Sequence, residues 1–177
     1  MNLKSDDFEL FGLATRFVQD RAAIDARWKD LQREAHPDKF AAQGASAQRL
    51  AMQWSVRINE AYQRLKDPLK RAAYLCELNG AAVNAENNTA MPKEFLLQQM
   101  AWREALDEAG SAAELDDLNS QVRAAQREAL QKCAQLLDQQ KNYQEAVQQV
   151  RALMFIERFA SDVETRLDRM DTPDKGQ

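Results

Sequence analysis

Apolar residues recur along this chain at intervals of three and four, the spacing that places side chains on one face of a helix. Most of the glycine and proline residues stand between these periodic segments, where helices begin or end. The pattern predicts an all-α protein. The expected helices span about residues 5–11, 20–36, 46–66, 68–78, 92–109, 111–136 and 142–167.

Helix ends and buried faces follow from the same pattern. Ser5 is the expected N-cap of the first helix, and Ser111 with Glu114 forms a capping box that starts the sixth. The core face of the third helix is predicted to hold large side chains and one alanine, namely Leu50, Trp54, Ile58, Ala61, Tyr62 and Leu65.

The chain divides into two parts of different charge. Residues 81–91 lack helical periodicity and contain three Asn, which is typical of a connection. Residues 1–80 carry 13 basic and 11 acidic groups, whereas the remainder carries 11 and 17. We therefore expect an N-terminal helical domain over 1–78, a linker over 79–91, an antiparallel three-helix bundle over 92–171 and a frayed tail over 172–177.

Composition excludes several function classes. A net charge of −4 without a run of Lys or Arg argues against nucleic-acid binding. No apolar stretch is long enough to span a membrane, and the first residues turn acidic, so we expect a cytoplasmic protein with no membrane partner. One His and two distant Cys make a poor set of metal ligands, and we predict no metal, no cofactor and no catalytic residue.

The single histidine stands in the segment His36-Pro-Asp-Lys-Phe40, between two helices that the short connection makes antiparallel. By itself this tripeptide is equally consistent with an ordinary helix end. Its surroundings change that interpretation. Phe8-Glu-Leu-Phe-Gly-Leu13 precedes it and Ile58-Asn-Glu-Ala-Tyr62 follows it, with Asp67-Pro68, Arg71 and Tyr74 farther on. In order and spacing, residues 1–78 resemble a J-domain.

This resemblance implies a helical hairpin that displays the His-Pro-Asp loop at its tip and stimulates ATP hydrolysis by a DnaK-class chaperone. The residues expected to bind that chaperone are His36, Pro37, Asp38, Lys29, Arg33, Arg27 and Lys39. Lys29 and Arg33 form one basic edge, while Arg27 lies on another side. Ala35 stands where J-domains often have Tyr, and Asp30 and Glu34 dilute the basic face.

The resemblance extends to the HscB family of iron–sulfur co-chaperones through Asp67-Pro-Leu-Lys-Arg-Ala-Ala-Tyr-Leu75 and Arg103-Glu-Ala-Leu-Asp-Glu108. It implies two partners, the chaperone HscA and the cluster scaffold IscU, and an activator of the chaperone's ATPase instead of an enzyme. The residues expected to bind the scaffold are Leu96, Leu97, Met100, Glu104, Glu108 and Phe155. Ala101 stands where family members can have an acidic residue.

The fifth helix carries two apolar faces. Phe95, Trp102, Leu106 and Ala109 share one stripe, which is enough to build a three-helix bundle. Leu96, Leu97 and Met100 lie on another face that Glu104 and Glu108 border, as in a protein-binding patch. The alternative is that this patch packs against the N-terminal domain. Two other functions stay open, a general J-domain co-chaperone for another client and a structural helical adaptor.

Overall fold

The computed structural model describes residues 4–84 and 90–171, and all regular elements in this part of the chain are helical. This confirms the predicted all-α fold. In chain order the elements are α1 (Asp7–Phe11), α2 (Arg21–Glu34), the 3-10 segment η1 (Pro37–Gln43), α3 (Ala45–Lys66), α4 (Pro68–Leu78), α5 (Lys93–Glu108), α6 (Ala112–Ala134), the π-helical turn η2 (Gln135–Gln139) and α7 (Tyr143–Asp171).

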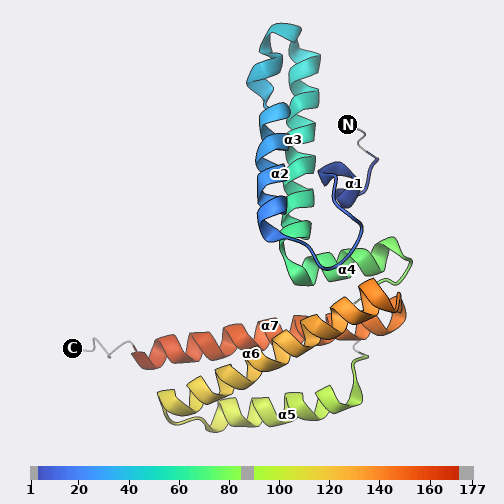
Figure 1. The fold of residues 1–177 in the computed structure, drawn as a ribbon. Coiled ribbons are helices and arrows are strands. Elements are labelled where there is room, and N and C mark those ends of the chain that lie inside the picture. Colours follow the sequence, from blue (N-terminus) through green and yellow to red (C-terminus); the bar gives the residue numbers. More distant parts are fainter. Residues whose placement is uncertain (1–3, 85–89, 172–177) are drawn as a thin grey trace, which may run out of the picture.

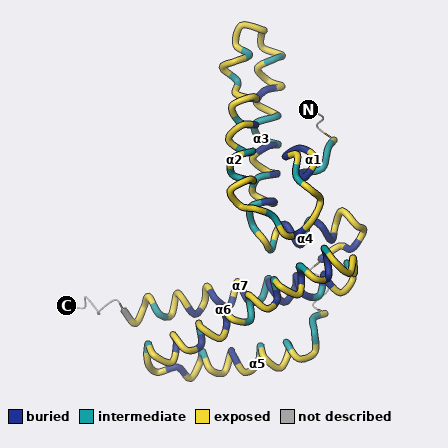
Figure 2. The backbone as a smooth tube through the Cα atoms, in the orientation of Figure 1, coloured by how far each residue is buried: buried dark blue, intermediate teal, exposed yellow. Residues whose placement is uncertain are grey.

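The molecule is bent (Figure 1). Helices α2 and α3 form a long antiparallel hairpin, α1 lies beside the lower part of α3, and α4 runs across the base of the hairpin. Helices α5, α6 and α7 form an antiparallel bundle on the other side of α4. Buried residues gather at the base of the hairpin and inside the bundle, while the hairpin tip is mostly exposed (Figure 2).

Two helix starts test the predicted caps. The capping box is present, because the Ser111 hydroxyl accepts a hydrogen bond from the Glu114 N–H, and the Glu114 carboxylate accepts one from the Ser111 N–H. The predicted Ser5 cap is wrong. Asp6 caps α1 instead, since its carboxylate accepts a hydrogen bond of 2.9 Å from the Glu9 N–H. A carboxylate at this position also interacts favourably with the helix dipole.

The seam of the hairpin contains the expected apolar side chains except one. Ile24 and Leu31 of α2 and Ile58, Ala61 and Leu65 of α3 are buried. Leu50, however, is 47% exposed, and Ala51 takes the inward position. Leu50 lies eight residues before Ile58, two steps of four that each rotate the side chain by about 40°, so it points away from the face that Ile58 marks. Ala51 lies seven residues before Ile58 and is rotated from it by only about 20°.

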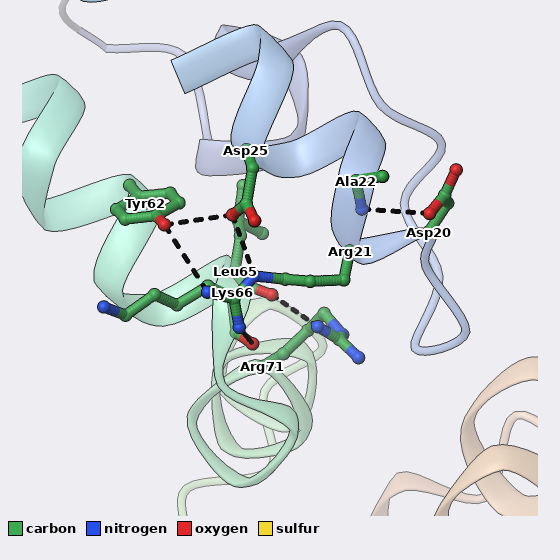
Figure 3. A network of polar contacts seen from close by, with 8 residues as sticks. All are labelled: Asp20, Arg21, Ala22, Asp25, Tyr62, Leu65, Lys66 and Arg71. Atoms are coloured by element: carbon green, nitrogen blue, oxygen red, sulfur yellow. Dashed lines mark hydrogen bonds and ion pairs between the residues drawn. The ribbon is translucent and has the colours of Figure 1, made fainter. Parts of the chain in front are cut away.

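Polar contacts hold the base of the hairpin together (Figure 3). The Arg21 Nε donates to the Asp25 carboxylate at 2.8 Å, and the Tyr62 hydroxyl donates to the same oxygen at 2.9 Å. The hydrogen bond from Arg21 holds the pKa of Asp25 below its ordinary value. Arg71 on α4 donates to the carbonyl of Leu65, near the end of α3. These bonds fix where α2 starts relative to where α3 ends.

A buried carboxylate ties α1 to the hairpin. Asp7 is fully buried and makes ion pairs with Arg57 at 2.6 Å and Arg64 at 2.7 Å, both on α3. Its backbone N–H also donates to the Tyr74 hydroxyl on α4 at 3.0 Å. Because an unpaired carboxylate would be costly in this position, both arginines are part of the fold.

The expected linker is described only at residues 79–84 and 90–91, and the tail over 172–177 lies outside the described residues. The described part of the linker is well anchored. Ala81 and Val83 are buried. The buried Arg151 of α7 donates to the carbonyls of Val83 at 2.9 Å and Ala90 at 3.1 Å. The guanidinium thus joins the two ends of the connection to the bundle.

Helix α4 packs against α7 and η2. Cys76 of α4 is buried with its Sγ 4.0 Å from the carbonyl oxygen of Tyr143, the first residue of α7. Cys133, near the end of α6, is buried as well. Burial raises the pKa of Cys76 to about 11 and that of Cys133 to about 12, from an ordinary value of 9.0.

We expect both thiols to be inert in the folded protein at pH 8. A pKa near 11 leaves about one-hundredth of the thiolate that a thiol of pKa 9 has at this pH, and burial blocks access as well. Reaction with Ellman's reagent should therefore be fast in urea and at least about 100-fold slower in buffer. Rapid titration of two thiols in the native protein would contradict the packing described for this interface.

The same pKa shifts carry a pH dependence of stability. The folded-state values lie above the ordinary value, so the unfolded chain loses its thiol protons first as the pH rises. The free energy of unfolding should thus be constant below pH 9.0 with respect to these groups and fall as the pH rises toward 11. Replacing Cys76 with Ser, measured by urea denaturation, should flatten this part of the pH profile.

Candidate protein-binding surfaces

The His-Pro-Asp segment lies at the free tip of the hairpin. His36 precedes η1, and its Nδ1 accepts a hydrogen bond of 3.3 Å from the Asp38 N–H. The Asp38 carboxylate lies 3.5 Å from the same nitrogen. The two side chains are 58% and 89% exposed, and η1 contributes no buried residue. The two side chains contact each other within the loop and are otherwise accessible to a partner.

The basic residues predicted around this loop are spread over α2 and η1. Lys29, Arg33 and Lys39 are exposed, whereas Arg27 is half-buried. Arg33 makes an ion pair with Asp30 at 3.3 Å, and Arg27 pairs with Glu34 at 3.6 Å. Two of the predicted cations, Arg27 and Arg33, are therefore partly neutralised within α2.

The second candidate surface lies on α5, the bundle helix farthest from the hairpin (Figure 1). Leu96, Leu97 and Met100 are 43%, 68% and 70% exposed. Glu104 and Glu108 are exposed one and two turns farther along the helix. These five residues form what we term the α5 patch. It does not pack against the N-terminal helices, so that alternative is wrong for this conformation.

Phe155 of α7 has a different environment from the α5 patch. It is half-buried in an aromatic cluster that joins α5 to α7, consisting of Phe95, Trp102, Phe155 and Phe159. The Phe155 ring centroid lies 5.7 Å from that of Phe95 in an edge-on arrangement and 5.8 Å from that of Phe159 in a stacked one. Phe155 therefore supports the fold of the bundle as well as reaching its surface.

Arg103 was noted only as part of the motif over 103–108 and was not among the residues expected to bind the scaffold. Its guanidinium lies over the Phe155 ring, 5.2 Å from the centroid, and so links the α5 patch to the aromatic cluster. The signal that could have found it is spacing, because Arg103 follows Met100 by three residues and lies close to it on the helix.

Residues 4–84 and 90–171 contain no group of three or more His, Cys, Asp or Glu that could hold a metal ion. No helix in these ranges is long and apolar enough to cross a membrane.

Comparison with known proteins bears on both parts of the chain. Residues 91–164 match the family model described as the HSCB C-terminal oligomerisation domain. The co-chaperone protein HscB homologue of Burkholderia multivorans is 46% identical over 175 residues, which covers 97% of this chain and 99% of the relative. The homologue of Paraburkholderia xenovorans is 46% identical over 173 residues, with 96% and 98% covered.

Two solved structures share the fold. The chaperone HscB from Vibrio cholerae superposes with a TM-score of 0.81 at 35% identity, covering 94% of this chain and 99% of that one. Human co-chaperone protein HscB superposes with a TM-score of 0.83 at 28% identity, covering 98% and 85%. Because the likeness spans hairpin and bundle together, in sequence and in structure, the chain belongs to the HscB family of co-chaperones, whose members are not enzymes.

Proposed function

We propose that this chain is a co-chaperone of iron–sulfur cluster biogenesis that brings the scaffold protein IscU to the DnaK-class chaperone HscA and stimulates the chaperone's ATPase. In this proposal residues 1–78 act as a J-domain, 79–91 connect, and 92–171 bind the scaffold. The observation that carries it is the separation of two exposed surfaces, the His36 and Asp38 side chains at the hairpin tip and the α5 patch on the far side of the bundle.

The chaperone would bind the hairpin tip. His36 offers a ring and a nitrogen, Asp38 offers a carboxylate, and Pro37 fixes the backbone between them. None of these side chains packs in the core, so they are accessible to a binding partner. Lys29 and Arg33 would steer the approach of an acidic surface over a range of about one Debye length, 8–10 Å. ATP is hydrolysed on the chaperone, and this chain supplies only binding energy.

The scaffold would bind the α5 patch. Three neighbouring apolar side chains with an acidic border have the composition of an interface core with a polar rim. Met100 and Leu97 are largely exposed, so a bound partner would remove much apolar surface from water at these two side chains. Arg103 and the edge of Phe155 extend the surface toward α7. Since the activity depends on a chaperone that consumes ATP, the proposal places the chain in the cytoplasm.

We expect His36→Gln and Asp38→Asn each to abolish stimulation of single-turnover ATP hydrolysis by HscA, while the melting temperature and IscU binding stay near wild type. The reason is that neither side chain is buried or holds another element. The measurement is hydrolysis over a range of co-chaperone concentrations. Gln43→Ala, an exposed change in the same η1 segment, is the matched control.

The outcomes of this titration separate the alternatives. Full stimulation by the His36 variant at every concentration would rule out the J-domain assignment and leave a structural adaptor. Full stimulation only at saturation would mean that the loop assists docking and does not trigger hydrolysis. Wild-type stimulation without any IscU binding would favour a general J-domain co-chaperone with another client.

We expect Leu97→Ala and Met100→Ala each to weaken IscU binding by about 1–3 kcal/mol, the usual cost of truncating an apolar anchor, without lowering the melting temperature. Phe155→Ala should lower both, because it removes a ring from the aromatic cluster. Calorimetry and thermal melts measure the two effects. Met52→Ala, which changes an exposed methionine on α3, is the control. Loss of stability with unchanged affinity in the Met100 variant would assign that residue to the core.

A further inference from the structure

A contact between residues about 120 apart in sequence joins the hairpin arm to the bundle. Asp138 lies in η2, at the end of α6, and its carboxylate reaches the segment between α1 and α2. Its Oδ1 accepts a hydrogen bond of 2.6 Å from the Phe17 N–H, and its Oδ2 accepts one of 2.9 Å from the Val18 N–H. A carboxylate that accepts two successive backbone N–H groups makes two charge-assisted bonds in one fixed orientation.

The other side of Phe17 is held by Arg71 of α4. The Arg71 Nε donates to the Phe17 carbonyl at 2.7 Å, and the guanidinium lies over the Phe17 ring, 5.3 Å from its centroid. Phe17 is buried. One residue is thus held through its N–H by the bundle, and through its carbonyl and ring by α4.

The two charges also act on each other. Burial lowers the pKa of Arg71, and the negative charges of Asp67 and Asp138 oppose this effect. Arg71 additionally donates to the Leu65 carbonyl on α3 (Figure 3). A chain of contacts therefore runs from η2 through Phe17 and Arg71 to α3 of the hairpin.

The π turn accounts for the placement of Asp138. The Gln140 N–H donates to the Gln135 carbonyl at 2.9 Å, a spacing of five residues, so this turn holds one residue more than an α-helical turn. Leu136 and Leu137 remain buried in the bundle while Asp138 is half-exposed at its end. The extra residue changes the direction of the side chains that follow by about 100° relative to an uninterrupted α-helix.

We propose that Asp138 is a positioning residue, which sets the angle between the hairpin and the bundle and thereby the separation at which the two partners are held. Helix α4 packs on α7 and η2, and Arg151 of α7 bonds the segment after α4 at Val83, so these attachments lie in one stretch of the chain. The Asp138 contact adds an attachment on a different segment, residues 12–20, and in this proposal it restricts rotation of the arm about α4. Only the last step, the effect on the partners, rests on the proposed function.

The test begins with Asp138→Ala and the isosteric Asp138→Asn, and Asp116→Asn on the exposed face of α6 is the control for loss of charge. Spin labels on Arg49→Cys in α3 and Ser120→Cys in α6 report the distance between arm and bundle by pulsed electron resonance. The native thiols are buried and do not compete for the label. We expect one narrow distance distribution in wild type and the control, and a broader one in both Asp138 variants.

The functional measurement uses the same variants in full-length form. Affinity for IscU alone and stimulation of HscA without scaffold should stay at wild-type values, because both surfaces are intact. The additional stimulation that bound scaffold produces should fall about tenfold, since the effective concentration of one partner at the other depends on geometry. If Asp138 had only a structural role, its variants would lower the melting temperature and would not selectively reduce the scaffold-dependent stimulation.

Two outcomes would overturn the proposal. The first is an unchanged distance distribution in Asp138→Ala, which would show that α4 packing alone fixes the angle. The second is a broader distribution with undiminished scaffold-dependent stimulation, which would show that the angle has no effect on delivery. If wild type itself fails to stimulate HscA, the proposed function is wrong, and the distances still decide whether Asp138 positions the arm.

Discussion

The packing of α4 against α7 is the apolar contact that joins the hairpin to the bundle. Helix α4 follows the hairpin in the chain and is bonded to it through Arg71, yet Cys76 faces the first turn of α7. Ala72, Leu75 and Cys76 are buried in this region. A single short helix therefore shares its surface between two cores, and loosening it would expose apolar groups of both. The hairpin and the bundle are expected to gain stability from each other for this reason.

Polar side chains specify the register of α2 against α3. The Trp28 indole N–H donates to the Asn59 amide oxygen at 2.9 Å, and Gln32 donates to the same oxygen at 2.8 Å. The Ser55 hydroxyl donates to the Gln32 amide oxygen at 2.9 Å. Two helices with a narrow apolar seam can slide past each other, whereas a connected set of hydrogen bonds is satisfied in one register. The position of the tip loop follows from this register.

Helical periodicity was sufficient to predict the seven α-helices found in the described ranges, because each has an apolar face and a local start or stop signal. It failed where the environment comes from distant parts of the chain. Asp138 and Arg151 look like ordinary surface charges on a helical wheel, yet their partners lie about 120 and 68 residues away. Such contacts leave no periodic signal in a single sequence.

The candidate sites show the same division. The tip loop was predicted from three adjacent residues and the order of motifs around it, since its geometry is local. The exposure of the α5 patch was predicted from two apolar stripes on one helix, because a bundle can bury only one of them. Phe155 was predicted only as a scaffold-binding residue, but its half-burial depends on its contact with Phe95 of a neighbouring helix. Side-chain contacts between helices decide that property, and a helical wheel contains only one helix.

A rigid arm has a physical consequence for a protein that holds two partners. A flexible connection lets the partners meet in many orientations, so their effective concentration is spread over a large volume. A fixed angle confines the second partner to a small region, which raises the local concentration when the surfaces match and prevents contact when they do not. In the proposed co-chaperone, selectivity for one pair of partners would then arise from the bend at α4 as much as from the side chains at either surface.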